Sequence, residues 1–406
     1  MGGITSTAVV AQPELPFDLL EEIFLRLEDA ADLIRVSAAC ASFHRLIFDG
    51  RFLRRFRSLH RPPVLGFLFD CNRSDRGFSF YPIELLRRSV PAAAHALARA
   101  ADFSISSFPK PIRGYWHVRD VRDGRILLSR HSASRKWSFF KYLMVYDPLH
   151  RRQVQIPPIS HDLVDAVGRD DDSHRQHFDP FLIPADVDED NLSFQVMCNV
   201  ISRDKVKATL LYCSVTREWH GVASRSTGSY GMDHCYGKRY FARGCFFWVD
   251  ETVMLMLDMR EMRFSMVDLP PGCEDGYKAV VEAIDGRVGL LILGDNTLDL
   301  YSKTLRDIGD RAKDWRHDHR IHLADDYLWF FAGGVVEGYT LLEGLRRDEY
   351  QVWESCSPDK EPVPNAHYFT VEIKKLVVKQ LCVLKLKQQP NFLYASFPPP
   401  FAPPRI

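Results

Sequence analysis

The sequence predicts a small all-α unit of three helices at the N-terminus, followed by an all-β domain that folds as a β-propeller. Apolar residues recur at helical spacing between residues 14 and 60, and short apolar strands bounded by turn residues take over after residue 61. A strand–turn–strand unit then returns after about 43 residues, an interval typical of a four-stranded propeller blade. With 406 residues the chain is long enough for two or three domains. We therefore divide it into a disordered leader (1–13), a helical unit (14–60), a propeller (61–395) and a Pro-rich tail (396–406).

Three amphipathic stretches make up the helical unit. Pro16 begins the first, where Asp18 is expected to cap the helix with Glu21 three residues on, as in a capping box. A second stretch starts after Asp29, and a third ends near Gly50. Their apolar positions follow helical spacing: Leu19, Ile23 and Leu27, then Leu33, Val36 and Cys40, then Phe43, Leu46 and Ile47. So small a unit buries little apolar surface, and we expect it to bind a partner.

The remainder of the chain has the pattern of strands. Short apolar runs bounded by turn residues occur at Val64–Phe69, Gly124–Ser129, Leu143–Tyr146, Ala208–Cys213 and Arg287–Leu293. The interval of about 43 residues separates Asp258 from Tyr301, and an acidic insertion lengthens the interval from Asp147 to Ser214. A pair of β-sandwiches is the alternative architecture, but sandwiches do not repeat such a unit at this spacing. The number of blades stays open.

Composition excludes several classes of protein. Lys plus Arg and Asp plus Glu both number 53, and a general nucleic-acid binder would carry a basic excess. No apolar run approaches the ~20 residues that span a bilayer. Nine cysteines without a C-x-x-C pair indicate reduced thiols and a cytoplasmic or nuclear location. Gly2 with Ser6 fits a myristoylation pattern, although a flexible leader is the preferred interpretation. We expect neither nucleic-acid nor membrane partners.

No catalytic or metal-binding constellation stands out. His317, His319 and His322 lie close together in sequence, but a metal site needs ligands on a rigid element with supporting contacts. His174 and His177 follow the acidic run 170–172, which lacks the glycine and closing glutamate of an EF-hand loop. We therefore predict no catalytic residue, no metal and no cofactor.

The helical unit resembles an F-box. The residues that carry the resemblance are Leu15–Leu27, Asp32–Ser37 and Cys40–Leu46, in which three helices and their spacings agree together. The family favours Trp at the position of Phe43, which keeps most of the apolar area. The rest of the chain looks like the propeller-type domain that follows the F-box in large plant F-box families. Asp102-Phe103 and Gly124–Leu128 carry this second resemblance.

The resemblance implies a non-catalytic substrate-recognition subunit of an SCF-type ubiquitin ligase. The F-box would dock on a SKP-family adaptor, and through it on a cullin scaffold, while the β domain binds a target protein of unknown identity. The residues predicted to bind the adaptor are Leu15, Pro16, Ile23, Leu27, Leu33, Val36, Cys40 and Phe43. The alternatives are a scaffold acting outside ubiquitination and a propeller enzyme. An enzyme needs convergent polar ligands from several blades, which the sequence does not show.

The zero net charge is a sum of opposed blocks. Residues 99–152 include twelve basic and four acidic residues. Residues 162–190 include two basic and ten acidic residues, and the stretch from Ala366 includes six basic residues and one acidic residue. Each block can be a solvated face. We predict instead that the acidic insertion and the early basic region give the propeller patches of opposite sign, which steer a charged partner.

Overall fold

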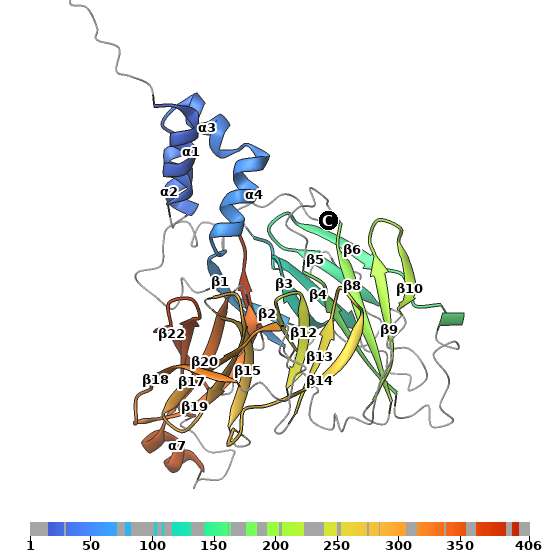
Figure 1. Cartoon of the computed structure of the whole chain (residues 1–406), viewed down its shortest axis with the longest axis vertical. Coiled ribbons are helices and arrows are strands. Elements are labelled where there is room, and N and C mark those ends of the chain that lie inside the picture. Colours follow the sequence, from blue (N-terminus) through green and yellow to red (C-terminus); the bar gives the residue numbers. More distant parts are fainter. Residues whose placement is uncertain are drawn as a thin grey trace, which may run out of the picture. The chain divides into compact units, whose positions relative to one another are not determined.

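The chain divides into two compact units, Met1–Arg61 and Pro62–Ile406. The computed structural model (Figure 1) describes residues 15–27, 30–70, 78–82, 101–103, 108, 116–130, 142–160, 162–163, 176–184, 193–202, 205–222, 239–249, 253–273, 276–283, 285–305, 315–336, 338–354, 363–386 and 392–397. The predicted leader, the myristoylation pattern, the tail beyond Phe397, the acidic run 170–172 and His174 lie outside these ranges.

The helical unit contains the three predicted helices and a fourth: α1 (Phe17–Leu25), α2 (Ala30–Ser37), α3 (Ala41–Ile47) and α4 (Gly50–Leu59). Pro16 occupies the N-cap of α1 and no side chain caps this helix, so the capping box expected at Asp18 is wrong. Asp18 lies in the first turn instead, where a carboxylate favours the positive end of the helix dipole.

The fourth helix follows directly on the third. Asp49 caps α4, since its Oδ1 accepts hydrogen bonds from the backbone N–H groups of Arg51 (2.8 Å) and Phe52 (3.3 Å). Its buried stripe is Phe52, Leu53 and Phe56. Four of the ten residues of α4 are arginines, and they obscure the apolar pattern. For this reason the sequence predicts no helix after Gly50.

Aromatic contacts hold the four helices together. Phe24 of α1 packs edge-on against Phe43 of α3, with ring centroids 5.1 Å apart. His60, just after α4, stacks on Phe56, and its Nε2 lies 2.6 Å from the carbonyl oxygen of Leu25 at the end of α1. The ends of α1 and α4 are thereby joined.

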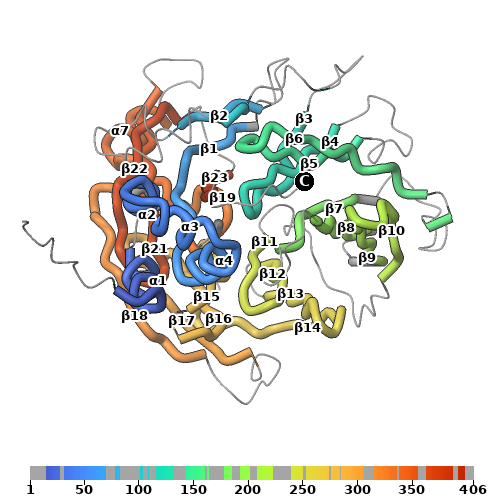
Figure 2. The backbone as a smooth tube through the Cα atoms, turned by 90° about the horizontal axis from the view of Figure 1, so that it is seen from above, coloured from blue at the N-terminus to red at the C-terminus, as the bar shows by residue number. Residues whose placement is uncertain are grey.

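The second unit is a six-bladed propeller. Each of the first five blades is an antiparallel sheet of four consecutive strands, and Figure 2 shows the sheets around a common centre. Blade 1 holds β3 (Trp116–Arg122), β4 (Arg125–Arg130), β5 (Leu143–Asp147) and β6 (Arg152–Ile156); blade 2 holds β7 (Gln176–Leu182), β8 (Gln195–Ser202), β9 (Lys205–Cys213) and β10 (Glu218–Val222); blade 3 holds β11 (Arg239–Ala242), β12 (Cys245–Val249), β13 (Val253–Asp258) and β14 (Arg263–Asp268). Blade 4 holds β15 (Tyr277–Glu282), β16 (Val288–Leu293), β17 (Thr297–Lys303) and β18 (Arg316–His322); blade 5 holds β19 (Tyr327–Val336), β20 (Tyr339–Arg346), β21 (Asn365–Glu372) and β22 (Val377–Lys385), with helix α7 (Arg347–Glu354) between β20 and β21.

Blade 6 closes the ring with strands from both ends of the domain. Its described part is the sheet β2 (Phe78–Pro82), β1 (Val64–Asp70) and β23 (Phe392–Ala395), in that order. The Ser396 backbone N–H donates to the carbonyl oxygen of Pro63 (3.2 Å), and the Tyr394 hydroxyl donates to that of Gly124 in blade 1 (2.9 Å). The chain's two distant segments are therefore paired beside the first turn of blade 1.

The repeated unit noticed in the sequence is the blade. Asp258 and Tyr301 lie in the third strands of blades 3 and 4, β13 and β17, so the predicted repeat is confirmed. The turn from third to fourth strand also recurs, with one residue at positive φ before the fourth strand in four of the blades: Arg151, Arg217, Met262 and Leu376 (φ 50° to 59°).

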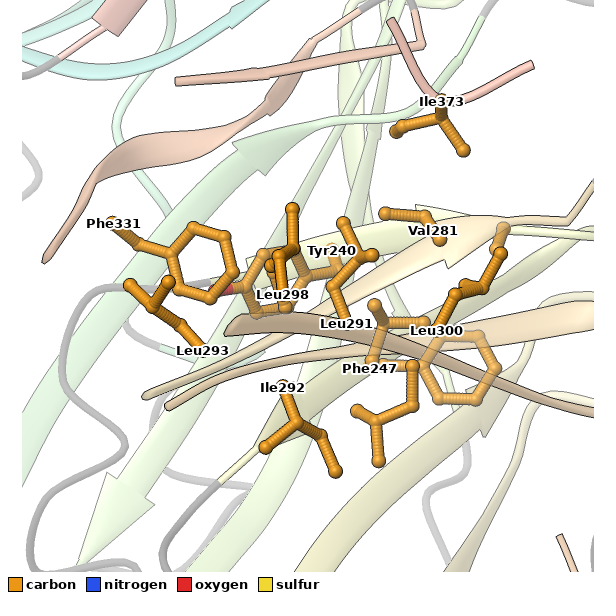
Figure 3. Packing of buried hydrophobic residues seen from close by; sticks show 14 of the residues in the cluster. Tyr240, Phe247, Val281, Leu291, Ile292, Leu293, Leu298, Leu300, Phe331 and Ile373 are labelled. Carbon is orange, nitrogen blue, oxygen red and sulfur yellow. The ribbon is translucent and has the colours of Figure 1, made fainter. Parts of the chain in front are cut away.

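The core lies between blades and is strongly apolar. In Figure 3, Leu291 and Leu298 of blade 4 gather with Tyr240 of blade 3 and Phe331 of blade 5. Fully burying one such side chain stabilises the fold by about 1.5–3 kcal/mol. Across the described residues, no helix is long and apolar enough to cross a membrane.

Candidate functional site

The helical unit exposes a stripe of large apolar side chains along α1. Leu19 and Ile23 stand at i and i+4 on α1, and Leu15 lies just before the helix; 52%, 47% and 52% of their surface is accessible, respectively. Phe17 is 62% exposed on the same helix. The opposite side of α1 is buried through Phe24. Helix α1 is thus apolar around most of its circumference, and only part of it is covered by the other three helices.

The predicted adaptor-binding residues divide by burial. Leu15, Pro16, Ile23 and Cys40 are exposed, and Leu27, Val36 and Phe43 are partly buried. Leu33 is fully buried and packs inside the unit. Four exposed large apolar residues were left out of the prediction: Phe17, Leu19, Ile34 and Leu59. The spacing of Leu19 and Ile23 signals one helix face, but spacing alone does not tell which face is covered.

Polar contacts fix the orientation of the stripe. Arg55 of α4 donates to Glu21 (3.1 Å) and Glu22 of α1, and these two hydrogen bonds raise the pKa of the guanidinium. Cys40 is the N-cap of α3, with its Sγ accepting from the Phe43 backbone N–H (3.5 Å). The residues flanking the stripe therefore serve to position the helices.

The innermost strands of blades 1, 2 and 3 meet in an ion-pair network. Arg239 of β11 contacts Asp179 of β7 (2.6 Å) and Asp120 of β3 (3.6 Å), and its guanidinium lies 4.0 Å from the centre of the Phe181 ring. Asp120 also accepts the backbone N–H of Leu182 (3.0 Å). The carboxylates of Asp120 and Asp179 therefore take part in bonds that join blades 1, 2 and 3, and this role is structural.

His317, His319 and His322 lie on β18, the outermost strand of blade 4. His317 Nε2 is 2.8 Å from Asp299, and Arg320 donates to both oxygens of the same carboxylate (2.6 and 3.1 Å). Burial raises the pKa of Asp299, but the hydrogen bonds from Arg320 and His317 outweigh it and lower the pKa overall. Within the described ranges, no three potential ligands come together to hold a metal ion.

One arginine of the early basic block is packed inward, while Arg151 and Arg152 of the same block are exposed. Arg125 is buried, donates to the carbonyl oxygen of Ser193 (2.9 Å) and lies over the ring of Phe194. Arg122 and Arg130 lie over aromatic rings as well. The predicted basic surface patch is therefore wrong for Arg125, whose long side chain joins the core over an aromatic ring, while Arg122 and Arg130 stay partly accessible.

Residues 13–59 match the family model described as F-box-like. The chain therefore has an N-terminal helical region with an F-box-like domain, followed by a six-bladed propeller. No curated protein matches the chain.

Among the solved structures that are similar to the chain, two of low identity are described here. One is a quinonprotein alcohol dehydrogenase-like protein from Bacteroides thetaiotaomicron, at 10% identity over 82% of this chain and 78% of that chain, with a TM-score of 0.33. Another is an ancestral GH74 enzyme, at 9% identity over 66% of this chain and 34% of that chain, with a TM-score of 0.32. Similarity at this level carries no functional argument.

Proposed function

We propose that this chain is the substrate-recognition subunit of an SCF-type E3 ubiquitin ligase. Its F-box-like unit docks on a SKP-family adaptor, the adaptor binds a cullin scaffold, and the propeller holds a target protein. The chain itself is not the catalyst, since it supplies proximity by raising the effective concentration of the target near the ubiquitin-charged enzyme. The exposed stripe Leu15, Leu19 and Ile23 on an F-box-like unit is the observation that supports this most strongly.

The energetics favour a partner that covers this stripe. Each aliphatic side chain that moves from water into an interface contributes about 1.5–3 kcal/mol, so the three residues suffice to anchor a stable complex. An amphipathic helix laid into an apolar groove is a common form of recognition. None of the described cysteines forms a disulfide, which agrees with a cytoplasmic or nuclear location, where disulfides are rare.

The test is recovery of the full chain on immobilised recombinant adaptor. Ile23→Asp would place a carboxylate in the interface, and we expect recovery to fall by about tenfold or more. The matched control is Val215→Asp, which changes another β-branched aliphatic side chain, 70% exposed in a propeller turn, and should leave recovery unchanged.

Equal recovery of wild type and Ile23→Asp would refute adaptor docking through this stripe. If docking is found but target abundance does not rise when the proteasome is blocked, the scaffold alternative is favoured over a ligase subunit.

A further inference from the structure

Helix α4 (Gly50–Leu59) carries an accessible serine in its last turn. Ser58 is exposed, and its hydroxyl donates to the carbonyl oxygen of Arg55 one turn earlier (2.7 Å). A hydroxyl that donates in this way keeps both lone pairs of its oxygen. Leu59 is 54% exposed, and the helix ends there, shortly before the pair Pro62-Pro63. Because the last turn of a helix opens more readily than its middle, Ser58 can be presented to an enzyme.

The residues around Ser58 are strongly basic. Helix α4 has four arginines and no acid among its ten residues, and Arg54, Arg55 and Arg57 precede the serine by four, three and one positions. Residues three and four apart lie on the same face of a helix, so Arg54 and Arg55 are neighbours of the Ser58 side chain. An active-site groove lined with carboxylates selects such a sequence by its charge. The surroundings of Ser58 therefore favour a protein kinase that recognises arginine before serine.

The arginine one turn before Ser58 also joins α4 to α1. The guanidinium of Arg55 binds the carboxylates of Glu21 (3.1 Å) and Glu22 on α1. The side chains of Arg55 and Glu22 are 47% and 48% exposed, and ion pairs that are so accessible to water are weak. Two positions after Ser58, the Nε2 of His60 lies 2.6 Å from a carbonyl oxygen at the end of α1. Ser58 is thus placed in the chain between two polar contacts that join these helices.

We propose that Ser58 is a phosphorylation site at which an arginine-directed protein kinase controls docking of the helical unit. The Ser58 Oγ attacks the γ-phosphorus of ATP, the bond to the oxygen of the β-phosphate breaks, and ADP leaves while the hydroxyl proton passes to a base of the kinase. The phosphate adds about two negative charges at neutral pH. This inference rests on the proposed function, since it names the regulation of the same adaptor-binding unit.

A phosphate on Ser58 competes for the arginine that holds α1. Phosphate oxygens form charge-assisted, bidentate hydrogen bonds with a guanidinium, and Arg55 is one turn away on the same face. Arg55 then leaves Glu21 and Glu22, whose carboxylates repel the new phosphate. A negative charge in the last turn also opposes the helix dipole, which weakens the end of α4 that precedes His60. Helix α1, which bears the exposed stripe, thereby loses its polar links to α4.

Labelling of the full chain with ATP tests the site itself. The enzyme is a recombinant calmodulin-dependent protein kinase, which selects arginine three residues before serine. We expect a phosphate on Ser58, located by mass spectrometry of peptides, and Ser58→Ala should remove it. Arg55→Gln should slow labelling of Ser58 by about tenfold. The matched control Arg51→Gln removes an exposed arginine of the same helix, seven positions before the serine, and should leave the rate unchanged.

Recovery on immobilised adaptor tests the consequence. We expect about fivefold lower recovery of the phosphorylated chain than of the untreated chain, and a phosphatase should restore it. Ser58→Ala treated with the kinase should be recovered as well as untreated wild type. Arg55→Gln without kinase should lower recovery by a smaller factor, because it removes the same bonds to Glu21 and Glu22 without adding a negative charge.

The absence of phosphate from Ser58, or equal or greater recovery of the phosphorylated chain, would overturn the proposal. Loss of recovery in kinase-treated Ser58→Ala would assign the effect to another residue and overturn it as well. The proposed function fails separately, if untreated wild type is not recovered on the adaptor. Circular dichroism then decides without an adaptor: a lower thermal midpoint of the helical signal in the phosphorylated chain than in kinase-treated Ser58→Ala supports the loosening of α1, and equal midpoints refute it.

Discussion

The helical unit and the propeller differ in how they treat large apolar side chains. The helical unit leaves exposed Leu15, Phe17, Leu19, Ile23, Ile34 and Leu59 within a short stretch of chain. The far larger propeller, over its described residues, exposes only isolated positions: Val215, Tyr277, Val352, Val377 and Val383. Every blade has a neighbour on each side to cover its faces, whereas four short helices cannot cover one another completely. The propeller completes its own core, whereas the helical unit leaves large apolar side chains accessible.

The same substitution in the two regions gives the largest expected contrast. Leu291→Ala empties a fully enclosed site in the propeller and should cost about 2–5 kcal/mol of stability. Leu19→Ala removes an exposed side chain and should change stability by less than about 0.5 kcal/mol while weakening adaptor binding. All seven tryptophans follow residue 61, so tryptophan fluorescence monitors the propeller alone, and circular dichroism adds the helices. Similar losses of stability for the two variants would contradict the contrast.

A second pair of substitutions tests how the propeller closes on itself. Gly124 has φ +72°, and a Cβ there would lie 2.5 Å from Ser396 Oγ, so Gly124→Ala should cost about 1–3 kcal/mol. Gly244 has a similar φ of +77° with no atom within 4 Å of a Cβ, and Gly244→Ala should cost only the backbone strain of about 1 kcal/mol. Thermal unfolding followed by tryptophan fluorescence measures both. Adding Ser396→Gly to Gly124→Ala should recover the difference, and failure to do so would locate the strain elsewhere.

The smallest expected effect concerns a buried carboxyl in blade 5. Burial raises the pKa of Glu343 above its usual range, although the Tyr368 hydroxyl donates to it (2.9 Å). Because the folded pKa exceeds the unfolded value, this group's contribution to stability is complete below the unfolded pKa and is lost as pH rises through the folded pKa. Glu343→Gln keeps an oxygen acceptor without that loss. The thermal midpoint of the Glu343→Gln variant minus that of wild type should increase from mildly acidic to neutral pH. A difference that stays constant with pH would contradict a raised pKa for Glu343.

Local patterns were sufficient to predict some of the strands and the first three helices. Alternation and turn residues located β1, β4, β5, β9 and β16, and the interval between Asp258 and Tyr301 revealed the blade repeat. Helix α4 was missed because its arginines obscure the stripe of Phe52, Leu53 and Phe56. In blade 1, the arginines predicted a basic surface patch because charged residues are usually solvated, but Arg125 is buried.

By itself, the sequence determined the order of elements, the F-box-like pattern and the propeller class, because these follow from spacing between near neighbours. Only the tertiary structure decided three further features. Blade 6 forms from β23 and β1, which come from opposite ends of the domain, and this completes six blades. Leu33 lies inside the helical unit while Leu19 remains outside, although both fit the same helical spacing. Arg347, the first residue of α7 (Arg347–Glu354), bonds this helix of blade 5 to Asp325 and Asn296, which belong to the connections of blade 4. Each of these depends on contacts between residues far apart in the chain, and burial is decided by those contacts and not by local periodicity.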